Sequence, residues 1–304
     1  MNNITEKLLA QIGFEQDAWK SALSIRENGS CAALQSTEDV RIDRKEDGSG
    51  IVLHIRAGSR GGRAYIPACV THSDVHDIVT NDFYVGEGAQ VTIIAGCGVH
   101  SDEKGEALHN GIHRFFVEKN AVVTYIEKHV GTGRSDDKKI NTESQFVLAE
   151  GASAYVTTEQ LGGVNTARRD TTATLEKNAV FSVRERLLTD GQDRVETVFV
   201  VQLNGENSKT DVVSRSVARG DSLQRYESRI EGNTACTGHT ECDAILAENG
   251  RVEAAPCLAA NCADAELIHE AAIGKIAGEQ ILKLCSLGLT REEAEQKIIE
   301  GFLK

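Results

Sequence analysis

The residues best suited to chemistry gather near the end of this sequence, from Cys236 onward. This stretch holds five of the eight cysteines, together with two histidines and a glutamate that directly follows one of them. They are Cys236, Cys242, Cys257, Cys262, Cys285, His239, His269 and Glu270. Thiolates and imidazoles are ligands for iron, zinc and iron–sulfur clusters. The stretch is therefore the first candidate for metal or sulfur chemistry, and the alternative is a set of small residues in a tight core.

Strand alternation predicts how these side chains are distributed. In a strand, Cys236 and Cys242 would share one face and His239 would point to the other. For the same reason the neighbours His269 and Glu270 would face opposite ways, one inward and one outward. A solvated surface pair is the alternative interpretation of His269 and Glu270.

A sixth cysteine, Cys97, stands in the string AGCGVH at the end of an alternating apolar run. Glycine on both sides of a strand residue allows another backbone or a ligand to approach closely. Cys97 is therefore a second candidate for chemistry. The alternative is an ordinary buried thiol, since free cysteine is among the most buried residue types.

Other cysteines and histidines have spacings that a structural zinc ion could use. These sets are Cys69 with His72 and His76, Cys97 with His100, and His109 with His113. Residues three apart in a strand lie on opposite faces, which disfavours the spacings of Cys69 with His72 and of Cys97 with His100 in strands. A zinc-stabilised interaction module stays open as an alternative.

The elements that must position these residues are mostly strands. Residues 1 to about 30 show helical spacing, with a second short helix expected around Trp19, Leu23 and Ile25. From Val40 to about Ala265, short alternating runs are separated by Gly, Asn or Asp. The strings GEGAQV, EKNAVV, AEGASA and EKNAVF repeat one form, and their alanines (89, 121, 152 and 179) are spaced by 32, 31 and 27 residues.

Repeated strands at a nearly fixed period indicate stacked units. Since no helical pattern lies between them, a mainly β fold is expected, and tight Gly or Asn corners favour a β-helix. A sandwich or an antiparallel barrel is the alternative. Two helices are predicted at the end: Glu279 to Leu287, which Gly288 would stop, and a second that opens with a Thr290/Glu293 capping box. We expect helical segments at both ends to cap the solenoid.

Composition limits the function. The 304 residues carry a net charge of −13, and only 2 are proline, so one continuous body without a linker is expected. No basic face or long apolar run is present, which argues against nucleic acid and membranes as partners. Without an apolar leader, a cytoplasmic location is expected, where the cysteines would be mostly thiols.

Three strings near the C-terminus resemble one known family. ECDAIL, IHEAAIGKI and EQILKLCSLGLTREEAEQKIIEGFL occur in the order found in the C-terminal half of SufB/SufD iron–sulfur cluster assembly proteins. The resemblance implies a right-handed parallel β-helix with a helical N-terminal segment (1–38), a β-helix core (39–268) and a C-terminal helical segment (269–304). The short chain is similar to a compact, minimal-system type of the family, which leaves the SufB and SufD labels both open.

The resemblance also implies a function and its partners. The protein would be a non-enzymatic scaffold that holds a transient iron–sulfur cluster, works with a SufC-like ABC ATPase and a sulfur donor such as a cysteine desulfurase, and pairs with a second β-helix subunit, most simply a copy of itself. It has no GxxxxGK[ST] loop, so it should not hydrolyse ATP itself. The alternatives are a SufD-like supporting subunit without its own cluster and, with little support, a glycan-cleaving β-helix enzyme.

The resemblance assigns residues to these tasks. Cys242 and Glu270 correspond to positions implicated in building the cluster and binding its metal. Cys97 is similar to the position at which sulfur enters, and His269 matches the histidine used by SufD-like members. The C-terminal helices would dock the ATPase through apolar residues, for which we expect Leu282, Leu287, Leu289, Ile298 and Phe302.

Overall fold

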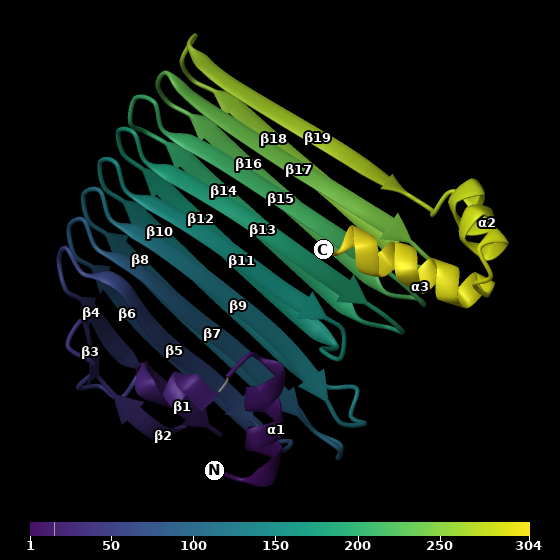
Figure 1. Cartoon of the computed structure of the whole chain (residues 1–304), viewed down its shortest axis with the longest axis horizontal. Helices are drawn as coiled ribbons and strands as arrows, with labels where there is room; N and C mark the ends of the chain where they lie inside the picture. Colours follow the sequence, from purple (N-terminus) through teal and green to yellow (C-terminus); the bar gives the residue numbers. More distant parts are fainter. Residues whose placement is uncertain (15) are drawn as a thin grey trace.

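The structure is a computed structural model that describes residues 1–14 and 16–304. It is a parallel β-solenoid of about eight coils, in which each coil contributes one strand to each of two facing sheets (Figure 1). In order, sheet A contains β2 (Ser30–Gln35), β1 (Ala22–Glu27), β5 (Arg60–Val70), β7 (Gln90–His100), β9 (Val122–Thr132), β11 (Ser153–Leu161), β13 (Val180–Thr189), β15 (Lys209–Ala218), β17 (Cys236–Leu246) and β19 (Ala265–Gly274). Sheet B contains β3 (Val40–Arg44), β4 (Ile51–Ile55), β6 (Val75–Val85), β8 (Ala107–Val117), β10 (Lys138–Leu148), β12 (Thr166–Leu175), β14 (Arg194–Leu203), β16 (Leu223–Gly232) and β18 (Arg251–Ala260).

The repeated strings form one kind of corner, as their pattern predicts. At Gly88, Asn120, Gly151 and Asn178 the backbone φ lies between 56° and 71°, a left-handed conformation that glycine and asparagine adopt most readily. The alanine that follows each of them is fully buried. A small side chain is needed there because the chain turns inward between the two sheets.

Between the sheets, equivalent side chains of successive coils stack on one another. Phe83, Phe115 and Phe146 are register partners in sheet B, and the neighbouring ring centroids are 4.4 Å apart in both pairs. This apolar column fills one part of the interior. Another part holds charged and hydroxyl side chains, described below, so the core is divided lengthwise into an apolar and a polar portion.

The N-terminal prediction is correct only in part. Helix α1 (Asn3–Gln11) and a 3₁₀ turn, η1 (Gln16–Lys20), are followed by β1 and β2 instead of a second helix. Residues Ala22 to Ile25 are buried without alternation because one face of β1 lines the interior and the other is covered by α1. A strand buried on both faces shows no period-two pattern, so its sequence is easily taken for helix.

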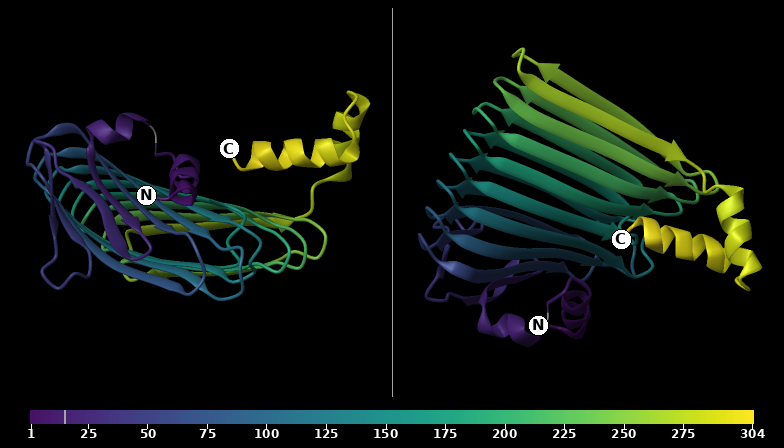
Figure 2. Two further views of the ribbon diagram at one scale, coloured as in Figure 1. Left: turned by 90° about the horizontal axis from the view of Figure 1, so that it is seen from below. Right: turned by 45° about the horizontal axis from the view of Figure 1, so that its top comes forward.

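The two C-terminal helices are present, as α2 (Gly278–Ser286) and α3 (Arg291–Phe302). Gly288 adopts φ +98° after α2, and Thr290 and Glu293 form the expected capping box. They do not cap the last coil: they project to the side, and α3 turns back along the outer face of sheet A (Figures 1 and 2). The expected boundary at residue 268 also falls inside β19.

The terminal strands β18 and β19 therefore stay exposed along their whole length, with Leu258, Ile268 and Ile273 on the surface. None of the helices that the structure describes in residues 1–14 and 16–304 is long and apolar enough to cross a membrane.

Candidate functional site

Cys242 lies on β17, in the last coil but one, and points into the solenoid. Its side chain is buried, and its register neighbours are Ser214 on β15 and Ala271 on β19. Burial, reinforced by the nearby negative charges of Glu185 and Asp243, raises the pKa of the Cys242 thiol to about 12. The thiol is therefore protonated at neutral pH, and a bound metal would have to displace that proton.

His269 lies on the same inner face, on β19. Its register partner is Thr240, two residues before Cys242 on β17, which makes His269 a diagonal neighbour of Cys242. The Nδ1 atom of His269 is buried and has no hydrogen-bond partner among the described residues. A buried imidazole nitrogen without a partner beside a thiol is an arrangement suited to a metal or a cluster.

Glu270 points to the opposite, outer face of the same sheet. It is opposite Glu241 in the register of β17 and β19, and its Oε2 lies 3.5 Å from Nε2 of His239. The structure thus does not bring Cys242 and Glu270 together within one chain, although the family resemblance pairs them. Strand alternation separates them: the wall of the solenoid lies between the thiol and the carboxylate.

Cys97 also points into the solenoid, on β7, and is 2% exposed. Burial first, and then the charges of Glu127 and Asp77, raise the pKa of its thiol well above the ordinary value. Its register partner on β9 is His129, and atoms of Cys97, Glu127 and His129 that could bind a metal lie within 4.8 Å of one another.

The hydrogen bonds of His129 decide what this buried trio can do. Arg169 donates from Nη2 to Nδ1 of His129 at 3.0 Å, which leaves the neutral ring's proton on Nε2. Nε2 then faces Glu127 at 3.4 Å as a donor, without a lone pair for a metal. The trio therefore offers a metal no lone pair from His129, and the ionised Glu127 keeps the Cys97 thiol protonated.

A column of polar side chains connects the surroundings of the two inward thiols. His113 contacts the hydroxyl of Tyr125 at 2.7 Å, and Tyr125 donates to Glu127. Beyond His129, Arg169 donates to Glu185, which accepts from Ser214 at 2.6 Å, next to Cys242. Each neighbour in the column is within hydrogen-bonding or ion-pair distance of the next, so the column is continuous through the buried interior.

This column was not predicted above, although the sequence contains a signal for it. In the string VVTYIEKHV, every second residue faces the same side of the strand. On one side these residues are Val123, Tyr125, Glu127 and His129. Charged residues in the inward phase of a buried strand need partners, because an isolated buried charge is costly. Such residues mark a functional or structural network.

Of the other cysteine and histidine sets, His109 and His113 both point into the buried interior beside Cys97, whereas the remaining sets are spread apart. Cys69 lies beneath α1, on the face of β5 opposite to the interior, whereas His72 and His76 are exposed. His100 contacts Thr132, and His109 contacts Asp77. Within residues 1–14 and 16–304, none of these sets brings three metal-ligand atoms within 4.8 Å of one another.

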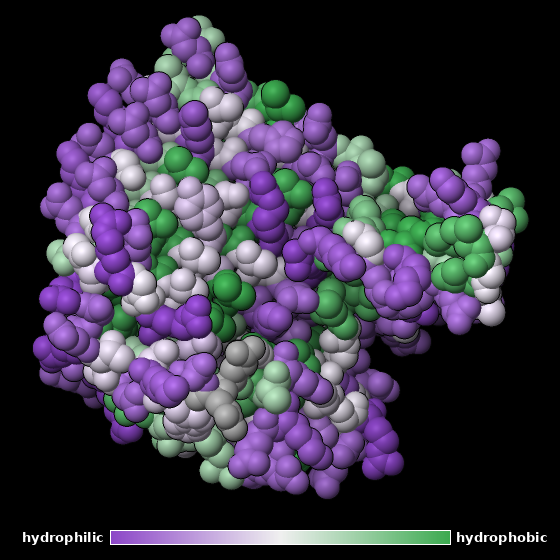
Figure 3. All heavy atoms as spheres, viewed as in Figure 1, coloured by the Kyte–Doolittle hydropathy of each residue, from purple (hydrophilic) through white to green (hydrophobic). Residues whose placement is uncertain are grey.

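The C-terminal helices form an arm. Only the end of α3 packs on the solenoid, where Ile299 and Leu303 contact Val217. Leu282 and Leu287 are 69% and 73% exposed, and hydrophobic atoms gather on the projecting α2 (Figure 3). The other expected docking residues, Leu289, Ile298 and Phe302, are half-buried.

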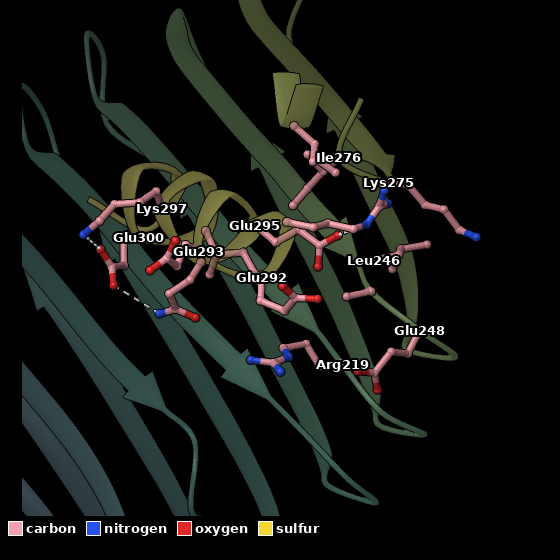
Figure 4. Close-up of a pocket in the computed structure, with 15 residues that line it drawn as sticks. Arg219, Leu246, Glu248, Lys275, Ile276, Glu292, Glu293, Glu295, Lys297 and Glu300 are labelled. Atoms are coloured by element: carbon pink, nitrogen blue, oxygen red, sulfur yellow. Dashed lines mark hydrogen bonds and ion pairs between the residues drawn. The ribbon is translucent and has the colours of Figure 1, made fainter. Parts of the chain in front are cut away.

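A cavity of about 790 Å³ lies between this arm and the ends of β15 and β17 (Figure 4). Its lining is mainly charged and includes Arg219, Lys275 and Glu292 but no cysteine or histidine. It is therefore a space under the arm and not a place for thiol chemistry.

Comparison with known proteins shows which family this chain is similar to. A family model described as "SUF system FeS cluster assembly, SufBD core domain" matches residues 73–302. An "Iron-sulfur cluster assembly SufBD family protein" of Archaeoglobus fulgidus is 31% identical over 273 residues, which cover 88% of this chain and 71% of that protein. A relative with the same family description from Methanocaldococcus jannaschii is 27% identical over 89% of this chain and 86% of its own length. One from Methanothermobacter thermautotrophicus is 28% identical, and the match spans 60% of it.

Proposed function

This chain belongs to the SufBD family of SUF-system iron–sulfur cluster assembly proteins, and from that membership we propose that it is a non-enzymatic scaffold on which a cluster is built and then released. One observation carries the proposal most directly. The inward thiol of Cys242 lies diagonal to His269, whose buried Nδ1 has no hydrogen-bond partner among the described residues. Both belong to the last two strands of sheet A.

Cys242 and His269 would bind the cluster from one chain. An iron–sulfur cluster is usually held by four protein ligands, so two ligands from one chain leave the binding incomplete. A second chain that meets this one along β18 and β19 would supply the matching pair. Ligands split between subunits suit a scaffold, because a small shift of the subunits loosens the cluster for transfer.

The exposed edges of β18 and β19 support pairing with a second solenoid. Each is a ten-residue strand with unpaired backbone groups on one side, which is a ready template for another strand. A copy of the same chain is the simplest partner, since a two-fold axis lets the same edge serve both subunits.

Cys97 would accept sulfur. In that step the Cys97 thiol loses its proton and attacks the outer sulfur of a donor persulfide, so that the donor recovers its thiol and Cys97 becomes the persulfide. The two inward thiols are separated by five strand spacings, roughly 24 Å at about 4.8 Å each, which is too far for direct exchange. The polar column through Glu127, Arg169 and Glu185 lies between them and contains no thiol, so a small thiol reductant would have to release the outer sulfur of Cys97 as hydrosulfide, itself becoming a disulfide, before the sulfur could move along the column to Cys242. A cysteine desulfurase is the donor class expected.

The arm of α2 and α3 would dock an ABC-type ATPase such as SufC. Its exposed Leu282 lies on α2 and its exposed Leu287 directly follows that helix, away from the packed end of α3, so a partner could bind there without disturbing the core. Movement of the ATPase subunits would then be passed to the paired solenoids.

The test is anaerobic reconstitution with ferrous iron and sulfide, on the chain co-expressed with its ATPase. Wild type should gain the broad visible absorption of a cluster, Cys242→Ala should lose it, and Cys257→Ala, an exposed thiol on β18, should keep it. Equal spectra for wild type and Cys242→Ala would place the cluster elsewhere. No cluster in any variant would favour a supporting subunit that completes another chain's site.

A further inference from the structure

The outer face of the last two sheet A strands carries a second group of ligand atoms, separated from Cys242 by the sheet itself. His239 and Glu241 on β17 and Glu270 on β19 place one nitrogen and two carboxylate oxygens within 4.8 Å of one another. His239 and Glu241 are half-buried and Glu270 is exposed. The two ligands on β17 are therefore partly enclosed by protein, and the ligand on β19 is open to solvent.

The two glutamates occupy an unfavourable position by themselves. Glu241 and Glu270 are register partners on adjacent strands, where like charges directly opposite each other destabilise the pair. Among the described residues neither glutamate forms an ion pair with lysine or arginine: Glu270 pairs with His239, and Arg215 acts on Glu241 only through its charge from a greater distance. A positive ion between the carboxylates would remove the repulsion.

The orientation of His239 is fixed by a third carboxylate. Nδ1 of His239 lies 2.8 Å from Oδ1 of Asp211 on β15, and Asp211 is in turn bonded by Arg184 on β13. When a carboxylate accepts a hydrogen bond from Nδ1–H, the lone pair of the neutral imidazole is on Nε2. Histidines that bind metals are commonly held in this way, because the outer carboxylate sets the tautomer and increases the basicity of the ligand nitrogen.

The geometry points to a site for one divalent transition-metal ion, bound by His239 Nε2 and by the carboxylates of Glu241 and Glu270, with Asp211 orienting the imidazole. One nitrogen and two oxygens suit Fe²⁺, Mn²⁺, Co²⁺ or Zn²⁺ better than Mg²⁺, which prefers an all-oxygen shell. Water would complete the coordination on the open side. Without the ion, Nε2 of His239 can carry a second proton that points to Glu270, and metal binding displaces this proton.

The buried trio around Cys97 provides an internal contrast. There Arg169, a donor, occupies Nδ1 of the histidine, whereas at His239 an acceptor occupies the same atom. The two groups have similar ligand types and opposite tautomers, and only the outer group presents a lone pair. That the ion taken up here is ferrous iron destined for the cluster rests on the proposed scaffold function, but the site itself does not.

Cobalt is the probe for the test, because Co²⁺ reports its ligands through visible absorption. The full chain should bind one Co²⁺ per chain, with ligand-field bands and no thiolate charge-transfer band. His239→Gln and Glu241→Gln should abolish this binding. Asp211→Asn, which keeps the shape of the side chain, should weaken it about 10- to 100-fold. Glu266→Gln, on the same strand and face as Glu270, should bind as wild type does.

Two further outcomes separate this site from the scaffold function. Cys242→Ala should keep the Co²⁺ spectrum even though it loses the reconstituted cluster, and failure of cluster reconstitution in wild type would leave the Co²⁺ result unchanged. The inference is overturned if His239→Gln binds Co²⁺ as tightly as wild type while its unfolding transition is unaltered. It is equally overturned if the wild-type spectrum shows a thiolate band that Cys242→Ala removes.

Discussion

Ile12, the C-cap residue of α1, lies directly against Gly96 of β7: a Cβ atom built on this glycine would be 2.6 Å from Cβ of Ile12. Leu8, one turn earlier on the helix, covers Gly98 in the same way. The glycines that flank Cys97 therefore allow the helix to pack on the outer face of the strand, while the thiol between them points inward. The close approach that the AGCG string predicts is made by α1.

Substitution of Gly96 should loosen this contact. Gly96→Ala forces a methyl group into Ile12, and overpacking of this kind costs about 1–3 kcal/mol of unfolding free energy. Gly274→Ala is the matched control, because nothing lies within 4 Å of the added Cβ and Gly274 also belongs to a sheet A strand. Denaturant titration of both variants measures the difference, and equal stability would mean that α1 does not pack there.

The thiols should differ widely in reactivity toward an alkylating reagent. Cys257 is exposed, whereas Cys242 is buried and its pKa is raised to about 12, so little reactive thiolate is present. At pH 8 we expect Cys242 to be alkylated at least about 100-fold more slowly than Cys257. Peptide mass spectrometry over time gives both rates, and labelling in denaturant should make them similar. Comparable rates in the native chain would show that Cys242 does not face the interior.

Mild acid should destabilise the fold through His113. Burial lowers the pKa of His113 from 6.5 to about 4, so between these values the unfolded chain binds a proton that the folded chain does not. The free energy of unfolding should therefore fall as pH drops through this window, by at most about 1.4 kcal/mol per pH unit. Stability from this residue is fully present above about pH 6.5.

His113→Gln should reduce the dependence of stability on pH between 6.5 and 4, with a part remaining because burial also lowers the pKa of His129. His54→Gln, on an exposed residue, should leave the dependence unchanged. The slope is the measurement, so a general loss of stability in the variant does not obscure the result. Depressed pKa values of Asp77 and Glu127, both about 2, contribute a separate loss that begins only below about pH 4.5. An unaltered slope in His113→Gln would show that another group controls this window.

The exposed leucines of the arm should control ATPase binding without affecting the fold. Leu282→Glu and Leu287→Glu each place a charge in the expected contact, which should weaken binding of a SufC-type ATPase roughly 30-fold, the effect of losing about 2 kcal/mol. Leu161→Glu, at a leucine that is 50% exposed on β11, is the control. Binding is followed by size-exclusion chromatography or interferometry, and undiminished affinity in both arm variants would remove the arm from the interface.

Much of the fold could be predicted because its signals are local. The corner glycines and asparagines, the alanine after each and the Thr290/Glu293 capping box specify structure within a few residues. The strand β1 could not be predicted, because its burial on both faces depends on α1 and on the interior at once. The lateral position of α3 depends on its contact with Val217, which is distant in sequence.

The sequence indicated which residues belong to the candidate site, but not which face of the sheet each residue of β19 lies on. Parity within β17 correctly separates Cys242 from His239, and parity within β19 separates His269 from Glu270. Which parity of β19 faces inward depends on the register across the β18 coil, which the sequence does not show. The structure places His269 with Cys242, and Glu270 with His239 and Glu241.

The two ends of the solenoid differ in a way that sets the size of any assembly. At one end the strands β2 and β3 are short and antiparallel to their neighbours, and the pairing of β1 with β2 is interrupted by a bulge, so this end resists further strand addition. At the other end β18 and β19 present straight edges of ten residues each. A solenoid with two such ends could add chains at both and grow into a fibre. A solenoid with one such end has no open strand edges left once that end has paired with a second chain. Self-association through these strands would therefore stop at two chains at any concentration.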